Sequence, residues 1–362
     1  MSTEAEDIPA PRCNGQLIGQ EAAEETLRRS YQSGRLPHAW LFTGPRGVGK
    51  ATLAYRFARF LLSRDEATDD LFGSEEAGLA LAPDHPVFRQ VAAGTHANLT
   101  VLERRPDDKG KVQKVIRVDD VRRANSFLQH TAARGGWRVV IVDSADDLNL
   151  NAANALLKIL EEPPARVVIM VIAHAEGTLL PTLRSRCCRL PMPALAPEQL
   201  EKLIGAWYPG SAVSDRDLLV RLSDGSPGRA ADLARNGGTE LYREMLSVLS
   251  ELPRPPAGAL HAFADRLARG RDDSSFRTGM DLLRWWVAAL ARHGTVHATP
   301  GLIDTDEQRL IARLLEWRPA NFWASFWERL GEHARGADRA NLDRKQVVLA
   351  AFLELETIEP GL

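Results

Sequence analysis

The chain has 362 residues, 44% of them hydrophobic, and a formal net charge of −2. This length and apolar content suffice for two or three packed domains. The near-zero charge excludes a polycationic nucleic-acid coat, so any contact with nucleic acid must come from a local basic patch.

Cellular location is indicated by the cysteines and by the start of the chain. Cys13, Cys187 and Cys188 form no disulfide framework, which fits a reducing cytoplasm. Residues 1–11 lack the basic and apolar regions of a signal peptide, and no apolar run approaches the length of a membrane span. We therefore predict a cytoplasmic protein whose residues 1–13 form a disordered tail.

Residues 14–193 alternate apolar runs with helical patterns, the order expected of a parallel α/β sheet with helices on both faces. The predicted strands cover residues 38–43, 99–102, 137–143 and 167–173. The predicted helices cover residues 51–62, 118–130 and 151–162. We interpret this region as a nucleotide-binding core.

The remainder of the chain carries helical patterns. Residues 194–240 are predicted to form a small helical lid, broken at Gly225-Ser226-Pro227-Gly228. Residues 241–362 are predicted to form an all-helical domain, because apolar residues such as Phe276, Met280 and Leu283 recur at helical spacing. A capping box is predicted at Thr305–Gln308.

Five tryptophans lie in this last region. We interpret them mainly as helix-bundle core, with a partner-binding surface as the alternative. They are Trp285, Trp286, Trp317, Trp323 and Trp327.

The segment Gly44-Pro-Arg-Gly-Val-Gly-Lys50 fits the phosphate-loop pattern, and it lies between a predicted strand and a predicted helix. Backbone N–H groups and the helix N-terminus favour a β-phosphate there, and Lys50 would neutralise phosphate oxygens. The alternative is a glycine-rich turn without a ligand. Ala51 stands where a Mg²⁺-binding Ser or Thr belongs, and Thr52 points about 100° away from that position.

Asp143 ends an apolar strand, where a second Mg²⁺-binding acid belongs. The position after it holds Ser144 instead of a catalytic glutamate, and a serine is a poor general base at neutral pH. We interpret Asp146 and Asp147 as charges at a helix N-terminus. Hydrolysis is therefore predicted to be impaired while the phosphate loop remains. The predicted nucleotide-binding residues are Gly44, Gly47, Val48, Gly49, Lys50, Ala51, Thr52 and Asp143.

The segment Leu183-Arg-Ser-Arg-Cys187 follows the last predicted core strand. In ring-forming ATPases an arginine at this edge reaches the γ-phosphate of the neighbouring subunit, where a planar, permanently charged guanidinium stabilises phosphoryl charge. The alternative is an ordinary surface arginine in a salt bridge.

Read together, these motifs resemble the AAA+ subunits of bacterial DNA polymerase III clamp loaders. The GKAT and DSAD segments, Gly49–Thr52 and Asp143–Asp146, are more similar to the delta-prime subunits than to the ATP-hydrolysing gamma/tau subunits. The motifs that carry the resemblance are Gly44–Lys50, Val118–Arg122, Asn151–Pro164, Leu183–Cys187 and Asn341–Gln346.

The resemblance implies an AAA+ core, a helical lid and a collar domain that joins the subunits in an open ring. It implies a subunit of the polymerase (nucleotidyltransferase) holoenzyme that helps load the sliding beta clamp onto primed DNA during replication, with little or no ATPase activity of its own. Arg186 would be the finger offered to a neighbouring ATPase. ATP or ADP binding would be weak or vestigial.

The implied partners are the gamma/tau and delta subunits, with transient contacts to the beta clamp. Primed DNA would be contacted through its phosphates, for which Arg122, Arg123 and Arg134 are candidates, although a solvated helix face explains these arginines equally well.

The chain departs from the family pattern in three places. Many members carry a four-cysteine zinc module in the stretch corresponding to residues 63–98, which here holds His85 and His96 but no cysteine, so no zinc is predicted. His174 occupies the sensor position that usually holds Thr or Asn. Arg229 lies one place later than the expected lid arginine.

Two other functions remain open. An ATP-hydrolysing gamma/tau-type motor requires Thr52 and Asp146 to replace the missing groups. A P-loop kinase acting on a small molecule leaves the arginine motif and the helical C-terminal region without a role.

Overall fold

The computed structural model describes residues 9–64, 78–105, 113–129, 136–269, 273–296, 304–340 and 342–357. Residues 1–8 of the predicted tail, Arg134, Asn341 and part of the zinc-module stretch lie outside this set. The chain divides into two compact units. The first comprises residues 1–209 and 225–229, and the second comprises residues 210–224 and 230–362.

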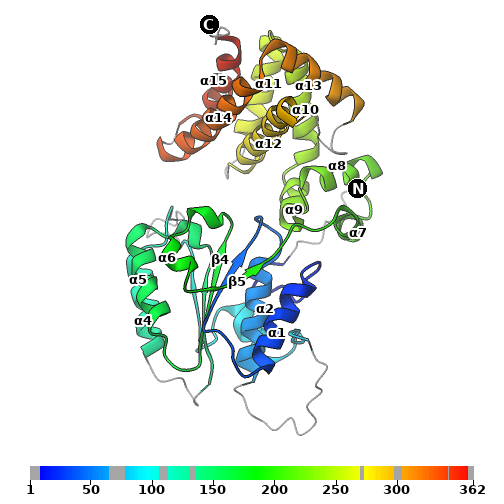
Figure 1. Ribbon diagram of the computed structural model, residues 1–362. Coiled ribbons are helices and arrows are strands. Elements are labelled where there is room, and N and C mark those ends of the chain that lie inside the picture. Colours follow the sequence, from blue (N-terminus) through cyan, green and yellow to red (C-terminus); the bar gives the residue numbers. More distant parts are fainter. Residues whose placement is uncertain are drawn as a thin grey trace. The chain divides into compact units, whose positions relative to one another are not determined.

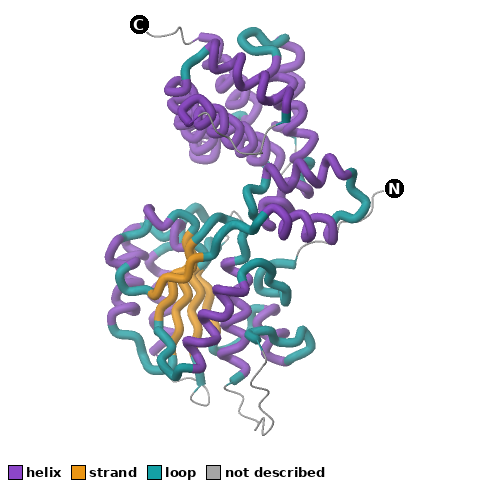
Figure 2. Tube along the Cα trace, turned by 45° about the vertical axis from the view of Figure 1, so that its right-hand side comes forward, coloured by secondary structure: helices purple, strands orange, loops and turns teal. Residues whose placement is uncertain are grey.

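The first unit is built on a five-stranded parallel sheet in the order β2-β3-β4-β1-β5, drawn in orange in Figure 2. Its strands are β1 (Ala39–Thr43), β2 (Leu99–Leu102), β3 (Arg138–Val142), β4 (Val167–Ala173) and β5 (Cys188–Pro191). The four strands predicted from the sequence are confirmed. The fifth was missed because it is a short edge strand with three exposed residues and a terminal proline.

Helices cover both faces of this sheet (Figure 1). On one face lie α1 (Glu21–Gln32), α2 (Lys50–Ser63) and α3 (Pro86–Ala93), and on the other lie α4 (Val118–Gln129), α5 (Leu150–Glu161) and α6 (Pro181–Arg184). Alternate residues of β1 pack into the two cores: Trp40 and Phe42 pack on the first face, and Leu41 packs on the second. The predicted parallel α/β sheet with helices on both faces is thus confirmed.

The C-terminal part of the chain is helical. Helix α7 (Pro197–Trp207) belongs to the first unit, and α9 (Pro227–Arg235) begins in the first unit and continues in the second. The other helices lie in the second unit: α8 (Val213–Leu222), α10 (Gly238–Ser250), α11 (Ala257–Ala268), α12 (Ser274–Val296), α13 (Thr305–Trp317), α14 (Ala320–Ala340) and α15 (Arg344–Thr357). In the described part of the chain, no helix is long and apolar enough to cross a bilayer.

The tryptophans of the second unit lie mostly in its core. Trp285, Trp286 and Trp323 are buried. Trp317 is half-buried, and Trp327 is 38% exposed, with the Arg284 guanidinium 4.7 Å from its ring centre.

The cap of α13 corrects the sequence prediction. The N-cap residue is Asp304, whose carboxylate accepts from the backbone N–H groups of Asp306 and Glu307, and Thr305 is the first helical residue. Asp caps as well as Thr does and bears a charge that favours the helix N-terminus.

A buried polar cluster ties α8 to α10 and α13 within the second unit. Glu307 is 4% exposed, and its carboxylate accepts from the Arg221 guanidinium at 2.6 Å and from the Tyr242 hydroxyl at 3.0 Å. The Arg221 guanidinium also lies 5.4 Å from the centre of the Tyr242 ring. Burial raises the pKa of Glu307, while Arg221 opposes that shift.

Candidate functional site

The predicted phosphate loop joins β1 to α2, and its glycines are required by the geometry. Gly44, Gly47 and Gly49 have φ values of 142°, 83° and 104°. A Cβ at Gly44 would lie 2.0 Å from the carbonyl oxygen of Met192, so no other residue fits there. Val48 is buried in the core and anchors the loop to the sheet.

Lys50 is turned back onto its own loop. Its ammonium group donates to the carbonyl oxygens of Gly44 and Pro45 at 2.5 and 2.6 Å, and the residue is 3% exposed. Burial lowers the pKa of Lys50 to about 8, although the carboxylates of Asp146 and Asp143 oppose the shift. The cation that the sequence assigned to phosphate oxygens is therefore held by backbone carbonyls in this structure.

The start of α9 lies directly against the phosphate loop. The Ser226 hydroxyl donates to the Arg46 carbonyl at 2.7 Å, and the Gly228 amide donates to the Gly47 carbonyl at 2.9 Å. A Cβ at Gly228 would lie 2.8 Å from Gly47 Cα, so the two backbones touch. The role of Arg229, which follows Gly228 and lies one place later than the expected lid arginine, stays a prediction.

The loop fits a phosphate group in part. It presents the N-terminus of α2, which favours an anion. The groups that would hold Mg²⁺ are less suited, since Ala51 has no hydroxyl and Thr52 is 8% exposed. Burial raises the pKa of Asp143, which disfavours its charged form. Within the described residues, no cluster of three or more His, Cys, Asp or Glu side chains could hold a metal ion.

Asp146 is a structural acceptor rather than a free base. Its carboxylate accepts from the backbone amides of His174 and Ala175 at 2.7 and 3.0 Å, and from the hydroxyls of Thr178 and Ser144, both at 3.2 Å. Burial alone would raise the pKa of Asp146, but these backbone hydrogen bonds lower it below the usual value. The interpretation of Asp146 as a charge for its own helix was therefore incomplete: it braces the loop after β4.

His174 follows β4 at the sensor position. Burial lowers its pKa to about 4, with a further contribution from the positive charge of Lys50, so the imidazole is neutral at pH 7. A neutral ring is a weak partner for a phosphate. The assignment of His174 as the sensor residue stays a prediction.

Arg186 lies between α6 and β5 and is held by its own chain. Its Nη2 atom lies 2.6 Å from Glu161 Oε1, and its Nη1 atom donates to the Thr182 carbonyl at 2.9 Å. The Arg186 side chain remains 35% exposed. Sequence reasoning missed Glu161, although its place at the C-terminal end of a helix, where a carboxylate is unfavourable, was a signal.

The arginines proposed for DNA contacts are paired within α4. Arg122 lies 3.0 Å from Asp119 with both side chains exposed, and Arg123 pairs with Asp120. Each of these positive charges is thus paired with a negative charge of the same helix, and a role of α4 in binding DNA phosphates stays a prediction.

The two histidines of the zinc-module stretch have local roles. The Nδ1 atom of His85 accepts from the Val87 amide at 3.2 Å and caps α3, and the Nδ1 atom of His96 accepts from the Asn98 amide at 3.2 Å. In both histidines the Nδ1 atom is thus occupied by a backbone hydrogen bond and is not available to a metal ion.

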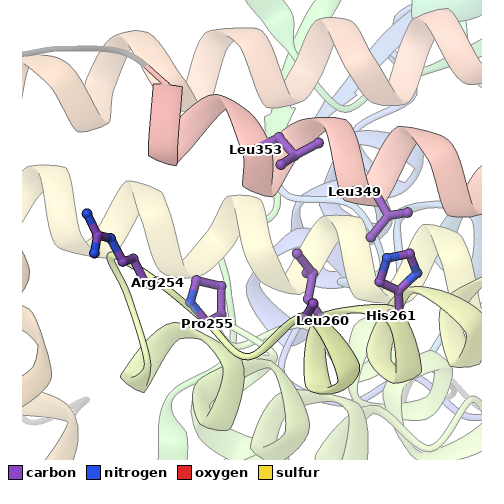
Figure 3. Close-up of a pocket in the computed structure, with 7 residues that line it drawn as sticks. Arg254, Pro255, Leu260, His261, Leu349 and Leu353 are labelled. Carbon is purple, nitrogen blue, oxygen red and sulfur yellow. The ribbon is translucent and has the colours of Figure 1, made fainter.

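A separate hollow of about 370 Å³ lies in the second unit between α11 and α15 (Figure 3). Its walls are mainly apolar, and the basic side chains of Arg254 and His261 complete them. The lining residues are Arg254, Pro255, Ala257, Leu260, His261, Leu349 and Leu353.

The buried ammonium group of Lys50 predicts a pH dependence of stability. Its pKa falls from an ordinary 10.5 to about 8 on folding. Between these values the unfolded chain binds more protons than the folded chain, so the free energy of unfolding rises with pH. Relative to Lys50→Met, the wild type should gain about 3 kcal/mol between pH 7 and 11, measured by urea unfolding. A constant difference across this range would contradict the assignment.

Comparison with known proteins bears on the identity of the chain. A family model described as DNA polymerase III, delta subunit, matches residues 19–196. DNA polymerase III subunit delta' of Pseudomonas aeruginosa is 34% identical over 281 residues, which cover 76% of this chain and 78% of that protein. The Escherichia coli subunit delta' is 32% identical over 293 residues, 80% of each chain.

The gamma/tau subunit of Mycobacterium tuberculosis is 30% identical over 67% of this chain, but the match spans 37% of that longer protein. The delta' relatives are thus matched over most of their length, and the resemblance drawn from the motifs is confirmed. The chain belongs to the DNA polymerase III delta-prime subunit family.

Proposed function

We propose that this chain is the non-hydrolysing stator subunit of a clamp loader, which helps place the sliding beta clamp on primed DNA during replication. Its partners are the gamma/tau and delta subunits. The clamp is contacted transiently, and DNA through its phosphates. The family membership supports the clamp-loader role, and the state of the phosphate loop supports the absence of hydrolysis.

The observation that carries the proposal is the occupied carboxylate of Asp146. It is the acid that an ATP-hydrolysing motor would need in place of the missing catalytic glutamate, yet it accepts hydrogen bonds from His174, Ala175 and Thr178. A carboxylate held in this way has a lowered pKa and accepts a proton reluctantly. Ser144 beside it and Ala51 in the phosphate loop further support impaired hydrolysis, because the first is a poor base and the second offers Mg²⁺ no hydroxyl.

Nucleotide binding is proposed to be weak or vestigial. ATP or ADP would be held by Gly44, Gly47, Val48, Gly49, Lys50, Ala51, Thr52 and Asp143. Binding must first displace the Lys50 ammonium group from two carbonyl oxygens. This rearrangement costs free energy, so affinity is expected to be low.

Arg186 is proposed to act in trans on a neighbouring ATPase subunit. Its side chain is partly exposed at an edge of the sheet, beyond the short helix α6. A planar guanidinium at such an edge can form paired hydrogen bonds with phosphate oxygens. The helical second unit is proposed to supply the collar contacts that hold the subunits together.

The test is ATP turnover by the purified chain. We expect no magnesium-dependent hydrolysis above that of Lys50→Met, which serves as the control for contaminating ATPases. The gamma/tau subunit of the same organism is the positive control. Turnover at the rate of that subunit would overturn the proposal and favour the motor alternative.

A further inference from the structure

Two motifs far apart in the sequence meet at the Arg186 side chain. Glu161 is the last residue of α5, and Arg186 follows α6. The Glu161 carboxylate and the Thr182 carbonyl oxygen each take one Nη atom of the guanidinium, at 2.6 and 2.9 Å. The orientation of Arg186 is therefore determined from two sides by its own chain.

Glu161 is poorly placed for the stability of its helix. The last turn of α5 carries the negative end of the helix dipole, where a carboxylate is unfavourable. Arg186 offsets this repulsion. The ion pair with Arg186 therefore compensates an unfavourable charge at the end of α5.

The ion pair between Arg186 and Glu161 is also easily broken. Both side chains reach solvent, with 35% of Arg186 and 48% of Glu161 exposed. Ion pairs at this exposure are weak, whereas a phosphate group offers an arginine stronger and bidentate hydrogen bonds. An incoming phosphate can therefore replace Glu161.

We propose that Glu161 is a positioning residue. It holds Arg186 in an ion pair in the unassembled chain and releases it to a phosphoryl group of a neighbouring subunit. This inference rests on the proposed role of Arg186 as a trans-acting finger. The ion pair keeps the guanidinium oriented and partly neutralised until a phosphate group replaces the Glu161 carboxylate.

A second arginine on the same edge provides a matched control. Arg189 lies on β5 and pairs with Glu176 at 2.6 Å, with 58% and 30% of the two side chains exposed. The N···O distance equals that of the Arg186–Glu161 pair, but Arg189 is more exposed than Arg186 and is not the predicted finger. Glu176→Gln should therefore leave both kcat/KM for ATP and the guanidinium rotation of Arg186 unchanged.

The experiment compares variants in the complex reconstituted with gamma/tau and delta subunits, beta clamp and primed DNA. Glu161→Gln should raise kcat/KM for ATP by about 1.5- to 5-fold, because the finger no longer has to leave an ion pair. Glu161→Asp should stay closer to wild type because it keeps a carboxylate. Glu161→Gln combined with Arg186→Ala should equal Arg186→Ala alone.

The outcomes separate the two proposals. One outcome is that Arg186→Ala abolishes ATP turnover while Glu161→Gln leaves kcat/KM unchanged or lowers it. In that case the positioning role of Glu161 is wrong, and the role of Arg186 as a finger is supported. If Arg186→Ala has no effect on turnover, the proposed roles of Arg186 and Glu161 are both wrong. NMR of the isolated chain tests the pair directly, since guanidinium rotation of Arg186 should be faster in Glu161→Gln and unaltered in Glu176→Gln.

Discussion

Replacing Arg186 with alanine should lower ATP hydrolysis at the neighbouring subunit of the assembled clamp loader by about 10³- to 10⁵-fold. The loss is large because a permanently charged guanidinium stabilises charge that develops on the transferred phosphoryl group. Arg186 is suited to this role by its place after α6 and by its partial exposure. The measurement is ATP turnover of the reconstituted complex with clamp and primed DNA.

Arg189→Ala is the control for this loss. Arg189 is another exposed, ion-paired arginine three residues along the chain, so its removal tests whether any positive charge on this edge suffices. We expect turnover close to wild type. Equal losses in both variants would mean that the edge acts through its overall charge, and intact turnover in Arg186→Ala would remove the finger from the mechanism. Circular dichroism should confirm that both variants fold.

Glu307→Ala should destabilise the second unit by about 3–5 kcal/mol. The substitution leaves the Arg221 guanidinium without its carboxylate and the Tyr242 hydroxyl without its acceptor, both in a largely buried cluster. An uncompensated buried charge is among the most destabilising changes a point mutation makes. The expected result is a lower urea midpoint, measured by tryptophan fluorescence, because Trp285 packs edge-on against Tyr242.

Asp306→Ala is the matched control, since Asp306 precedes Glu307 and also pairs with an arginine. The Asp306 and Arg309 side chains are 89% and 76% exposed, so this pair should contribute no more than about 1 kcal/mol. Similar losses in the two variants would contradict the stabilising role of the buried cluster. Glu307→Gln should lie between them, because an amide can still accept one hydrogen bond.

The fold was largely predictable because its signals are local. Buried strands such as β3 and β4 are nearly continuous apolar runs, which a parallel sheet covered on both faces requires. The edge strand β5 has no such run, because one side of it faces no further strand. It could not be predicted without knowing that it pairs with β1.

The candidate site was predictable in its residue types but not in its contacts. The phosphate loop and the substitutions Ala51 and Ser144 follow from identity and spacing, and so does the arginine motif that contains Arg186. The partners of these groups did not follow, because each comes from a segment distant in the chain. Asp146 is used by the loop after β4, and the phosphate loop is covered by Ser226 and Gly228.

By itself, the sequence determined the order of the elements, the family and the loss of two hydrolytic groups, since each of these depends on which residue occupies a position within a short pattern. Only the tertiary structure decided that Lys50 bonds its own loop and that Arg186 is held by Glu161. Both depend on distances of less than 3 Å between groups that the packing of the sheet and its helices brings together. Hydrogen bonds and ion pairs vary steeply with such distances, and residue spacing along the chain does not specify them.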